Sequence, residues 1–262
     1  RFNADKRRLY EASGCAGKIA VFAVRLDTYP TAKAEQTFYI GSNSVRELAE
    51  LRRQVLSTFK NMPEVDFMSV LHKSTSRDYL ARVNDIEFPK AKAAKLAKKW
   101  DYEYWDGDRS INYGGYKYIE NRWSNVINDL IEYYDLSEKA KILDIGCGKG
   151  FFLYDFVKLM PMCEAKGIDI SEYAIDNSKP EIKENLIVGN ATQLPWPDNY
   201  FDLVVSFNTL HNLFNFELEK ALKEMERVGK NKYLCVESYR NENEKANLLY
   251  WQVTCEAFNT PL

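Results

Sequence analysis

The sequence predicts an α/β protein built on a doubly wound parallel sheet. Two observations lead to this prediction. From residue 136 onward, apolar runs typical of buried strands alternate with stretches of helical periodicity. In addition, the first of these runs ends in Gly146, Gly148 and Gly150, directly before apolar residues of helical type. A glycine turn between a strand and a helix lets the backbone approach a nucleotide-like ligand closely, because no Cβ lies in the way.

The expected strands and helices alternate along residues 136–262. We expect strands at 141–146, 165–170, 185–189, 201–207 and 232–237, and helices near 150–160, 172–178, 216–228 and 242–258. In a sheet of this kind the ligand binds at the carboxyl ends of the strands. The turns that follow the strands are therefore where we look for site residues.

Two further regions precede this domain. Residues 1–75 predict a small α/β module with strands at 18–26, 37–40 and 65–71 and a helix that opens at Ser44. We expect a structural or dimerising role for it, and a substrate-selecting module is the alternative. Residues 76–135 are helical and aromatic in character. A lysine-rich helix is expected over 90–99, and a second helix with an apolar face is expected from 119 to 134.

Between these two helices lies a loop in which paired glycines are flanked by tyrosines. Glycines make such a loop mobile, and tyrosines supply rigid contact area with hydroxyl groups. We expect a lid over the ligand, formed by Tyr113, Tyr116, Tyr118 and Arg122. The alternative is a loop whose aromatic side chains only cover an edge of the core.

Composition excludes several classes of function. A net charge of −2 over 262 residues argues against a dedicated nucleic-acid binder, which normally carries a strongly basic face. No apolar run approaches the ~20 residues of a membrane span, and no secretory signal is seen, so we expect a cytoplasmic protein without membrane contact. The five cysteines lie at irregular spacing, which predicts no metal site. A homodimer would form through residues 1–75.

The residues around the glycine turn resemble motif I of the class I S-adenosylmethionine-dependent methyltransferases, an acid followed by Gly-x-Gly-x-Gly. Asp144 supplies the acid. A dinucleotide-binding fingerprint would instead need glycine at position 151, where this chain has Phe151. The resemblance continues in Asp169 after the second strand and in Asn190 after the third, where the family usually has Asp, and in a Phe-Asp pair before the fourth.

The resemblance implies a Rossmann-like domain that binds S-adenosyl-L-methionine and acts as a transferase. Asp169 would accept hydrogen bonds from the ribose hydroxyls of the donor, and Asn190 would accept one from adenine. The residues expected to bind the donor are Asp144, Gly146, Cys147, Gly148, Gly150, Asp169, Ile170, Asn190, Ala191 and Asn208.

Two residues after the fourth strand are candidates for catalysis. Asn208 would position the donor or the acceptor, and His211 would act as a base near neutral pH. A packing role for His211 stays open as the alternative. Glu237, at the end of the fifth strand, is a further candidate.

The expected acceptor is a small polar metabolite, such as a sugar or a sugar-nucleotide. One alternative is a non-catalytic partner protein that keeps the methyltransferase fold, and another is a nicotinamide-dependent oxidoreductase, which the glycine spacing disfavours. A complete class I domain has two more strands. We expect that these are missing from the chain, or that the amino-terminal strands cover the sheet edge instead.

Overall fold

The computed structural model describes residues 67–68, 71, 88–237, 239 and 242–257, together with the backbone of 20–24 and 38–42. The chain divides into two compact units, Arg1–Val65 with Leu262, and Asp66–Pro261. In the first unit, strands β1 (Ala20–Val24) and β2 (Phe38–Ser42) pair antiparallel, as two of the predicted strands. The helix expected after Ser44 lies outside the described residues.

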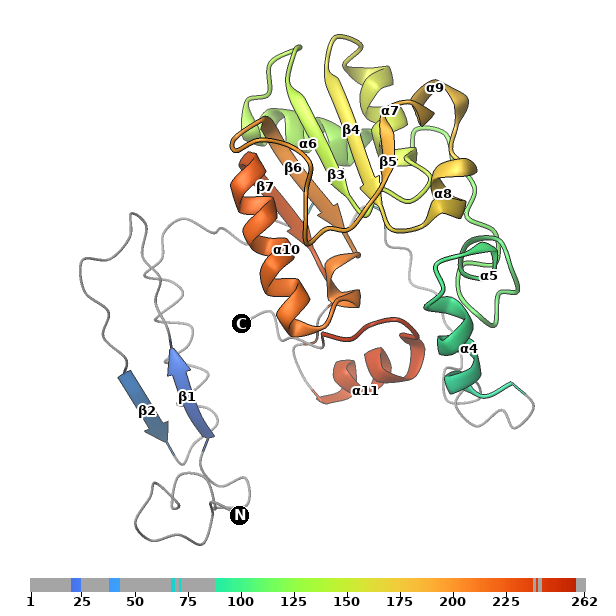
Figure 1. The fold of residues 1–262 in the computed structure, drawn as a ribbon, viewed down its shortest axis with the longest axis vertical. Helices are drawn as coiled ribbons and strands as arrows, with labels where there is room; N and C mark the ends of the chain where they lie inside the picture. Colours follow the sequence, from blue (N-terminus) through green and yellow to red (C-terminus); the bar gives the residue numbers. More distant parts are fainter. Residues whose placement is uncertain are drawn as a thin grey trace, which may run out of the picture. The chain divides into compact units, whose positions relative to one another are not determined.

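The second unit is organised around a five-stranded sheet in the order β5-β4-β3-β6-β7 (Figure 1). Its strands are β3 (Lys141–Ile145), β4 (Glu164–Asp169), β5 (Leu186–Val188), β6 (Phe201–Phe207) and β7 (Gly229–Cys235). All of their pairings are parallel, which confirms the predicted fold class. The strand order reverses between β3 and β6, and ligands of such sheets bind at this point.

Helices cover the sheet and precede it along the chain. They are α4 (Lys90–Ala97), α5 (Tyr102–Trp105), α6 (Ser124–Tyr134), α7 (Phe151–Leu159), α8 (Glu172–Asp176), α9 (Pro180–Lys183), the 3-10 helix η2 (Leu210–Asn212), α10 (Asn215–Val228) and α11 (Glu242–Trp251). In Figure 1, α10 lies in front of the sheet and α6 behind it. Buried residues of β3, β4 and β6 pack with Ala221, Met225 and Val228 of α10 into one core.

Local sequence explains where two of these helices begin. Gly150 adopts a left-handed conformation (φ 70°) directly before α7, which only glycine reaches without strain. The Ser171 side chain caps α8 by accepting a hydrogen bond from the backbone N–H of Ala174.

Three predicted elements differ from the structure. The helix expected from 119 begins only at Ser124, after a turn in which Ile119 is exposed. The helix expected to reach 258 ends at Trp251, because the following residues bond to the backbone carbonyl of His211 instead. The strand expected at 65–71 is absent at its described positions: Phe67 packs against the rings of Tyr133 and Tyr233, and Leu71 closes a turn.

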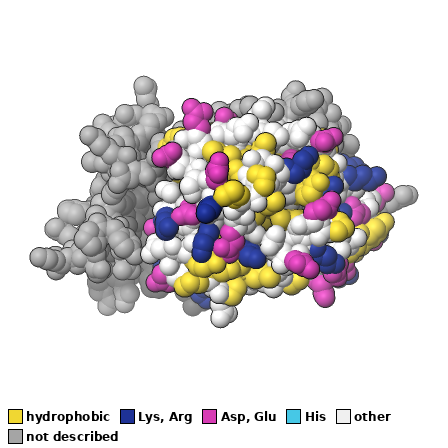
Figure 2. All heavy atoms as spheres, turned by 90° about the horizontal axis from the view of Figure 1, so that it is seen from above, with side chains coloured by type: hydrophobic (Ala, Val, Ile, Leu, Met, Phe, Trp, Pro, Cys, Tyr) yellow, Lys and Arg dark blue, Asp and Glu magenta, His cyan; other side chains and the backbone are white. Residues whose placement is uncertain are grey.

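Strands β1 and β2 form a sheet of their own and do not extend the five-stranded sheet. That these strands of a partner chain cover the edge of the parallel sheet stays a prediction. On the face of the molecule seen in Figure 2, positive and negative side chains are interspersed among apolar ones. No helix in the described ranges has the length and apolar character needed to cross a membrane.

Candidate active site

The glycine turn after β3 is shaped by backbone that only glycine tolerates. Gly146 and Gly148 have φ angles of 80° and 54°. A Cβ on Gly146 would overlap the Thr209 side chain, and a Cβ on Gly148 would lie 2.7 Å from the indole of Trp105. Positive φ and close neighbours therefore both disfavour any residue with a Cβ at positions 146 and 148.

A cavity of about 490 Å³ opens at the carboxyl ends of β3, β4 and β6, a size common for small-ligand sites. It is lined by nine of the ten residues expected to bind the donor: Asp144, Gly146, Cys147, Gly148, Asp169, Ile170, Asn190, Ala191 and Asn208. The tenth, Gly150, is not in the lining. A Cβ there would meet Leu186, so this glycine serves the close packing of α7 against the sheet.

Asp144 is a buried carboxyl group in the wall of this cavity. Its Oδ1 atom is buried and has no hydrogen-bond partner among the residues that the structure describes. Burial raises the pKa of Asp144 well above its ordinary value, and the neighbouring Asp169 raises it further. An unpartnered buried acceptor is costly. Asp144 is therefore a ready acceptor for a ligand's N–H or ammonium group.

Asp169 ties the second strand to the glycine turn. One of its carboxylate oxygens accepts the backbone N–H of Gly148 at 2.8 Å, and the other accepts the backbone N–H of Ser171 at 2.8 Å. Burial raises the pKa of Asp169, and these backbone hydrogen bonds oppose the rise. Because each oxygen can accept a second hydrogen bond, the carboxylate can still bind two ligand hydroxyls.

Two of the three asparagines in the lining, Asn190 and Asn208, each make a hydrogen bond with backbone. The Asn190 side-chain oxygen accepts the backbone N–H of Thr192 at 2.9 Å, and its amide group still borders the cavity. Asn208 is left-handed (φ 50°), and its backbone N–H donates to the carbonyl of Cys235 at 2.8 Å. The end of β7 thus fixes the turn that carries Asn208.

His211 lies outside the cavity lining. Its side chain is buried at 2% exposure, and its Nδ1 accepts the backbone N–H of Glu237 at 3.2 Å. Its Nε2 lies 3.3 Å from the Gln252 amide. Burial lowers the pKa of His211 to about 4, so the ring is neutral at pH 7. These contacts are typical of a histidine that packs inside the protein. They favour the packing role, which is the alternative to the predicted role as a base.

Glu237 also lies outside the lining, beside His211. Its carboxyl group accepts a hydrogen bond from the Gln252 amide. Burial raises the pKa of Glu237 to about 7, against the smaller lowering effect of that hydrogen bond. At pH 7 the carboxyl group of Glu237 is therefore protonated in part of the molecules.

Four aromatic side chains close the cavity above the glycine turn, and we call them the aromatic cover: Tyr104, Trp105, Tyr113 and Tyr116. The rings of Trp105 and Tyr113 stack with centroids 5.5 Å apart and an angle of 5° between their planes. Tyr113 in turn lies 4.7 Å from Tyr116. The predicted lid residues Tyr113 and Tyr116 thus border the cavity.

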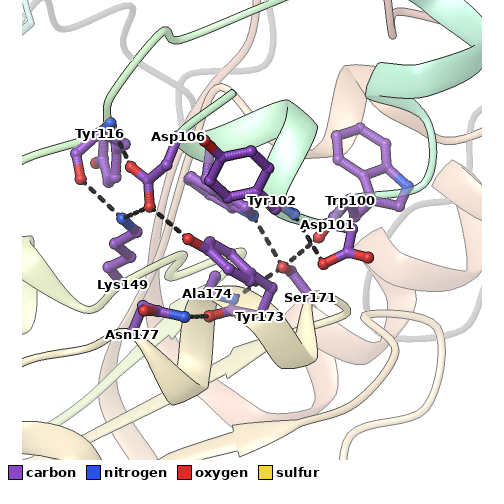
Figure 3. Close-up of polar contacts among 11 residues, drawn as sticks. Trp100, Asp101, Tyr102, Asp106, Tyr116, Lys149, Ser171, Tyr173, Ala174 and Asn177 are labelled. Atoms are coloured by element: carbon purple, nitrogen blue, oxygen red, sulfur yellow. Dashed lines mark hydrogen bonds and ion pairs between the residues drawn. The ribbon is translucent and has the colours of Figure 1, made fainter. Parts of the chain in front are cut away.

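Figure 3 shows how this cover is fastened to the domain beneath it. The ammonium of Lys149, which is 5% exposed within the glycine turn, pairs with Asp106 at 2.6 Å and donates to the carbonyl of Tyr116 at 3.1 Å. Asp106 also accepts the hydroxyl of Tyr173 on α8 at 2.8 Å. Burial alone would raise the pKa of Asp106, but the hydrogen bonds from Lys149 and Tyr173 outweigh it and hold the pKa below its ordinary value.

A second attachment lies at the other side of the cover. The indole N–H of Trp105 donates to the Ser171 hydroxyl at 2.8 Å, and that hydroxyl donates to the carbonyl of Trp100 (Figure 3). Ser171 is also the residue whose N–H is held by Asp169. The donor-binding side of the cavity and the aromatic cover therefore share one hydrogen-bond network.

Tyr118 and Arg122, the other two predicted lid residues, have different positions. The hydroxyl of Tyr118 donates to the buried Asp155 of α7 at 2.6 Å, and Tyr118 is not in the lining. It therefore anchors the loop and does not cover the ligand. Arg122 does line the cavity, and its guanidinium donates to the backbone carbonyl of Leu71 at 3.4 Å.

Trp105, Asp106 and Lys149 were not among the site residues predicted from the sequence. One signal was present: Tyr102, Tyr104 and Trp105 extend the aromatic-rich stretch upstream of the glycine-tyrosine loop. Lys149 gave no such signal, because a lysine in a turn is ordinarily solvated. Only the spatial approach of Asp106 explains its burial.

A protein-family model described as a methyltransferase domain matches residues 136–259. A demethylmenaquinone methyltransferase of Anoxybacillus flavithermus is 31% identical over 119 residues, 42% of this chain and 49% of that protein. An uncharacterised protein of Methanocaldococcus jannaschii is 32% identical over 135 residues, 50% of this chain and 55% of that protein.

A different kind of relative matches a shorter stretch. A quinone-dependent D-lactate dehydrogenase of Escherichia coli is 59% identical over 63 residues, 24% of this chain and 11% of the dehydrogenase. The chain thus spans about a tenth of that dehydrogenase and about half of each of the two other relatives. The family model covers the glycine turn, all five parallel strands and the donor-side lining, and it confirms the resemblance found in the sequence. Residues 136–259 of this chain are thus similar to a methyltransferase domain, in agreement with the class I S-adenosylmethionine-dependent methyltransferases that the glycine turn resembles.

Proposed function

We propose that this chain transfers a methyl group from S-adenosylmethionine to a small-molecule acceptor. The observation that carries the proposal is the buried, unpartnered Oδ1 of Asp144 beside the glycine turn. A buried hydrogen-bond acceptor without a partner in the cavity wall favours a ligand that supplies a hydrogen-bond donor. The ammonium group of S-adenosylmethionine is such a hydrogen-bond donor. The other residues around it also fit this methyl donor.

Each donor-side residue has a separate role in binding. Gly146 and Gly148 let the backbone approach the donor, and Asp144 would accept from its ammonium group. Asp169 would accept hydrogen bonds from two ribose hydroxyls. Each of its carboxylate oxygens already accepts one backbone N–H, from Gly148 or Ser171, and has a second lone pair for the ligand. Asn190 would contact the adenine edge through its amide group.

The donor supplies an electrophilic methyl group on a sulfonium centre. The protein's part is to hold the acceptor's nucleophile in line with that methyl group, and positioning of this kind can lower a barrier by ~7–11 kcal/mol. Asn208 follows the end of β6 and lines the cavity, and in this proposal it would contact either reactant. The described residues that line the cavity include no histidine.

A small polar metabolite, such as a sugar or a sugar-nucleotide, remains the proposed acceptor. The interspersed charges in Figure 2 and the net charge of −2 support a small molecule in preference to a nucleic acid. The likeness to a dehydrogenase covers a tenth of that protein and supports no proposal about redox chemistry. We further propose that residues 1–75 mediate dimerisation, which light scattering of the chain across a concentration series would test.

Calorimetric titration of the chain with S-adenosylhomocysteine tests the proposal, with NADH as the comparison ligand. We expect binding of the first and none of the second. Failure of the folded chain to bind S-adenosylhomocysteine would contradict the proposed function, and binding of NADH in its place would favour an oxidoreductase. Donor binding combined with no methyl transfer to any member of a metabolite panel would favour a non-catalytic partner protein.

A further inference from the structure

We propose that the acceptor carries both a planar ring and an anionic group, and that Arg122 binds the anion. This inference rests on the proposed function and narrows its substrate class. The ring would lie against three aromatic residues that line the cavity, Trp123, Phe152 and Phe207, which we call the ring wall. A nucleotide-linked sugar and an aromatic acid both have this chemistry, whereas a neutral free sugar does not.

The ring wall is a continuous aromatic surface. Its ring centroids lie 5.3 Å apart for Trp123 and Phe152, 5.0 Å for Trp123 and Phe207, and 4.9 Å for Phe152 and Phe207. Phe207 is the last residue of β6 and directly precedes Asn208, so the wall begins where the donor-binding lining ends. Aromatic rings favour flat partners that can stack or pack edge to face.

Charge is distributed unevenly around the cavity. Of the described lining residues, two carry a positive charge, Lys98 and Arg122. Lys98 pairs with Glu256. Arg122 pairs with no carboxylate among the described residues, and the hydrogen bond found for its guanidinium goes to the carbonyl of Leu71. A guanidinium can bind a carboxylate or phosphate through two parallel hydrogen bonds.

One buried carboxylate binds a side chain that precedes Arg122 and the backbone of the residue that follows it. Asp155, which is 2% exposed, accepts the hydroxyl of Tyr118 at 2.6 Å and the backbone N–H of Trp123 at 3.3 Å. The side chain of Arg122 therefore starts from a fixed position next to the ring wall. Arrangements of this kind reduce the entropy lost when a ligand binds.

Two of the four acidic lining residues favour the same orientation of the acceptor. Asp144 and Asp169 lie at the ends of β3 and β4, on the donor side. An anion there would face two carboxyl groups, while an anion at Arg122 meets an opposite charge. The acceptor's nucleophile forms its bond to the methyl carbon as the carbon–sulfur bond breaks, sulfur keeps that electron pair as a neutral thioether, and any proton on the nucleophile leaves to water.

The test is a calorimetric titration of the chain saturated with S-adenosylhomocysteine, using two matched pairs of probes. The first pair is 4-hydroxybenzoate and neutral 4-hydroxybenzyl alcohol, and the second is UDP-glucose and glucose. We expect one anionic probe to bind at least about tenfold more tightly than its neutral partner, and the pair that shows this identifies the source of the ring and anion.

Variants then assign the effect to Arg122. Arg122→Gln should weaken binding of the anionic probe by about ten- to hundredfold, the size expected for hydrogen bonds to a charged group. Arg122→Lys should restore part of the affinity. Lys117→Gln removes a charge from an exposed residue of the same loop that is not in the lining, and it should leave the affinity unchanged. Trp123→Leu should weaken both members of the benzoate pair by about two- to tenfold, because stacking is lost while apolar bulk is kept.

Equal binding of neutral and anionic probes, an unchanged affinity of Arg122→Gln, or no binding of either anionic probe would overturn this inference. In each of those cases S-adenosylhomocysteine would still bind, and the proposed function would stand. If S-adenosylhomocysteine itself fails to bind the wild-type chain, it is the proposed function that fails.

Discussion

The donor side of the cavity and its aromatic cover are built in different ways. The donor side consists of turns that directly follow β3, β4 and β5, where backbone shape and two carboxyl groups define the site. The cover consists of side chains from residues 104–116, held by contacts to residues more than thirty positions away in the sequence. The first arrangement depends on local geometry, and the second depends on long-range contacts. In a site of this kind, the residues on the donor side can stay the same between proteins while the residues of the cover differ to suit different acceptors.

The two parts meet at the glycine turn. Trp105 packs on Gly148, and Lys149 pairs with Asp106. A change in the turn should therefore disturb both parts, while a change in the cover should spare the backbone geometry of the turn. The predictions below test this asymmetry, from the largest expected effect to the smallest.

Gly146→Ala should have the largest effect. The new Cβ would overlap Thr209, and the left-handed backbone adds ~1–2 kcal/mol of strain for a residue with a Cβ. We expect affinity for S-adenosylhomocysteine to fall by roughly a hundredfold or more, measured by calorimetry. Gly115→Ala is the matched control, because it also has a positive φ (106°) but open space around its Cβ. Equal losses in the two variants would show that strain alone, and not the shape of the turn, explains the effect.

Asp169→Ala should weaken donor binding by ~2–3 kcal/mol, if two ligand hydrogen bonds of ~1–1.5 kcal/mol each are lost. The loss of support for the N–H groups of Gly148 and Ser171 adds to this effect. Asp202→Ala is the control. Asp202 also accepts a backbone N–H, from Lys141, but it lies at the opposite end of the sheet. A dissociation constant that stays the same in Asp169→Ala would contradict the ribose-binding role.

Lys149→Met should release the cover from the turn while the glycines stay intact. We expect S-adenosylhomocysteine to bind about tenfold more weakly, mainly through faster dissociation in stopped-flow measurements, because one buried charged contact of ~1.5 kcal/mol is lost. Lys158→Met is the control, because Lys158 lies in α7 and forms an exposed ion pair with Glu120. We expect this variant to bind and release S-adenosylhomocysteine at the wild-type rates. If both variants release the ligand at the wild-type rate, the cover does not retain the donor.

The smallest effect concerns the pH dependence of stability behind the cavity. The raised pKa of Glu237, about 7, means that the folded state keeps a proton that the unfolded state loses, so stability falls as pH rises toward and through 7. The lowered pKa of His211, about 4, has the opposite sign, and its contribution rises with pH between about 4 and the ordinary histidine value.

Glu237→Gln removes only the first of these contributions. The free energy of unfolding of the wild type, relative to this variant, should fall by about 1 kcal/mol between pH 6 and pH 8. Denaturant titrations at the two pH values provide the measurement. A constant difference between the two proteins would show that Glu237 is ionised throughout this range. The pH dependence of methyl transfer should not follow His211, because its ring lies outside the cavity lining.

Most of the donor side could be predicted because it depends on local sequence. Glycines at alternate positions after an apolar run, and an acid at the end of the next strand, place Gly146, Gly148 and Asp169 together wherever parallel strands pair. The role of Asp169 in holding Gly148 could not be predicted, since two strands must align before that contact exists.

The sequence by itself determined the fold class of residues 136–259, the order of the strands, and most of the residues at the carboxyl ends of the strands that line the cavity. Tertiary structure decided the rest. It placed His211 outside the cavity lining, Tyr118 against Asp155, and Lys149 against Asp106. The physical reason is that backbone conformation follows from neighbouring residues. The partner of a charged or aromatic side chain is chosen only when distant segments pack together and exclude water.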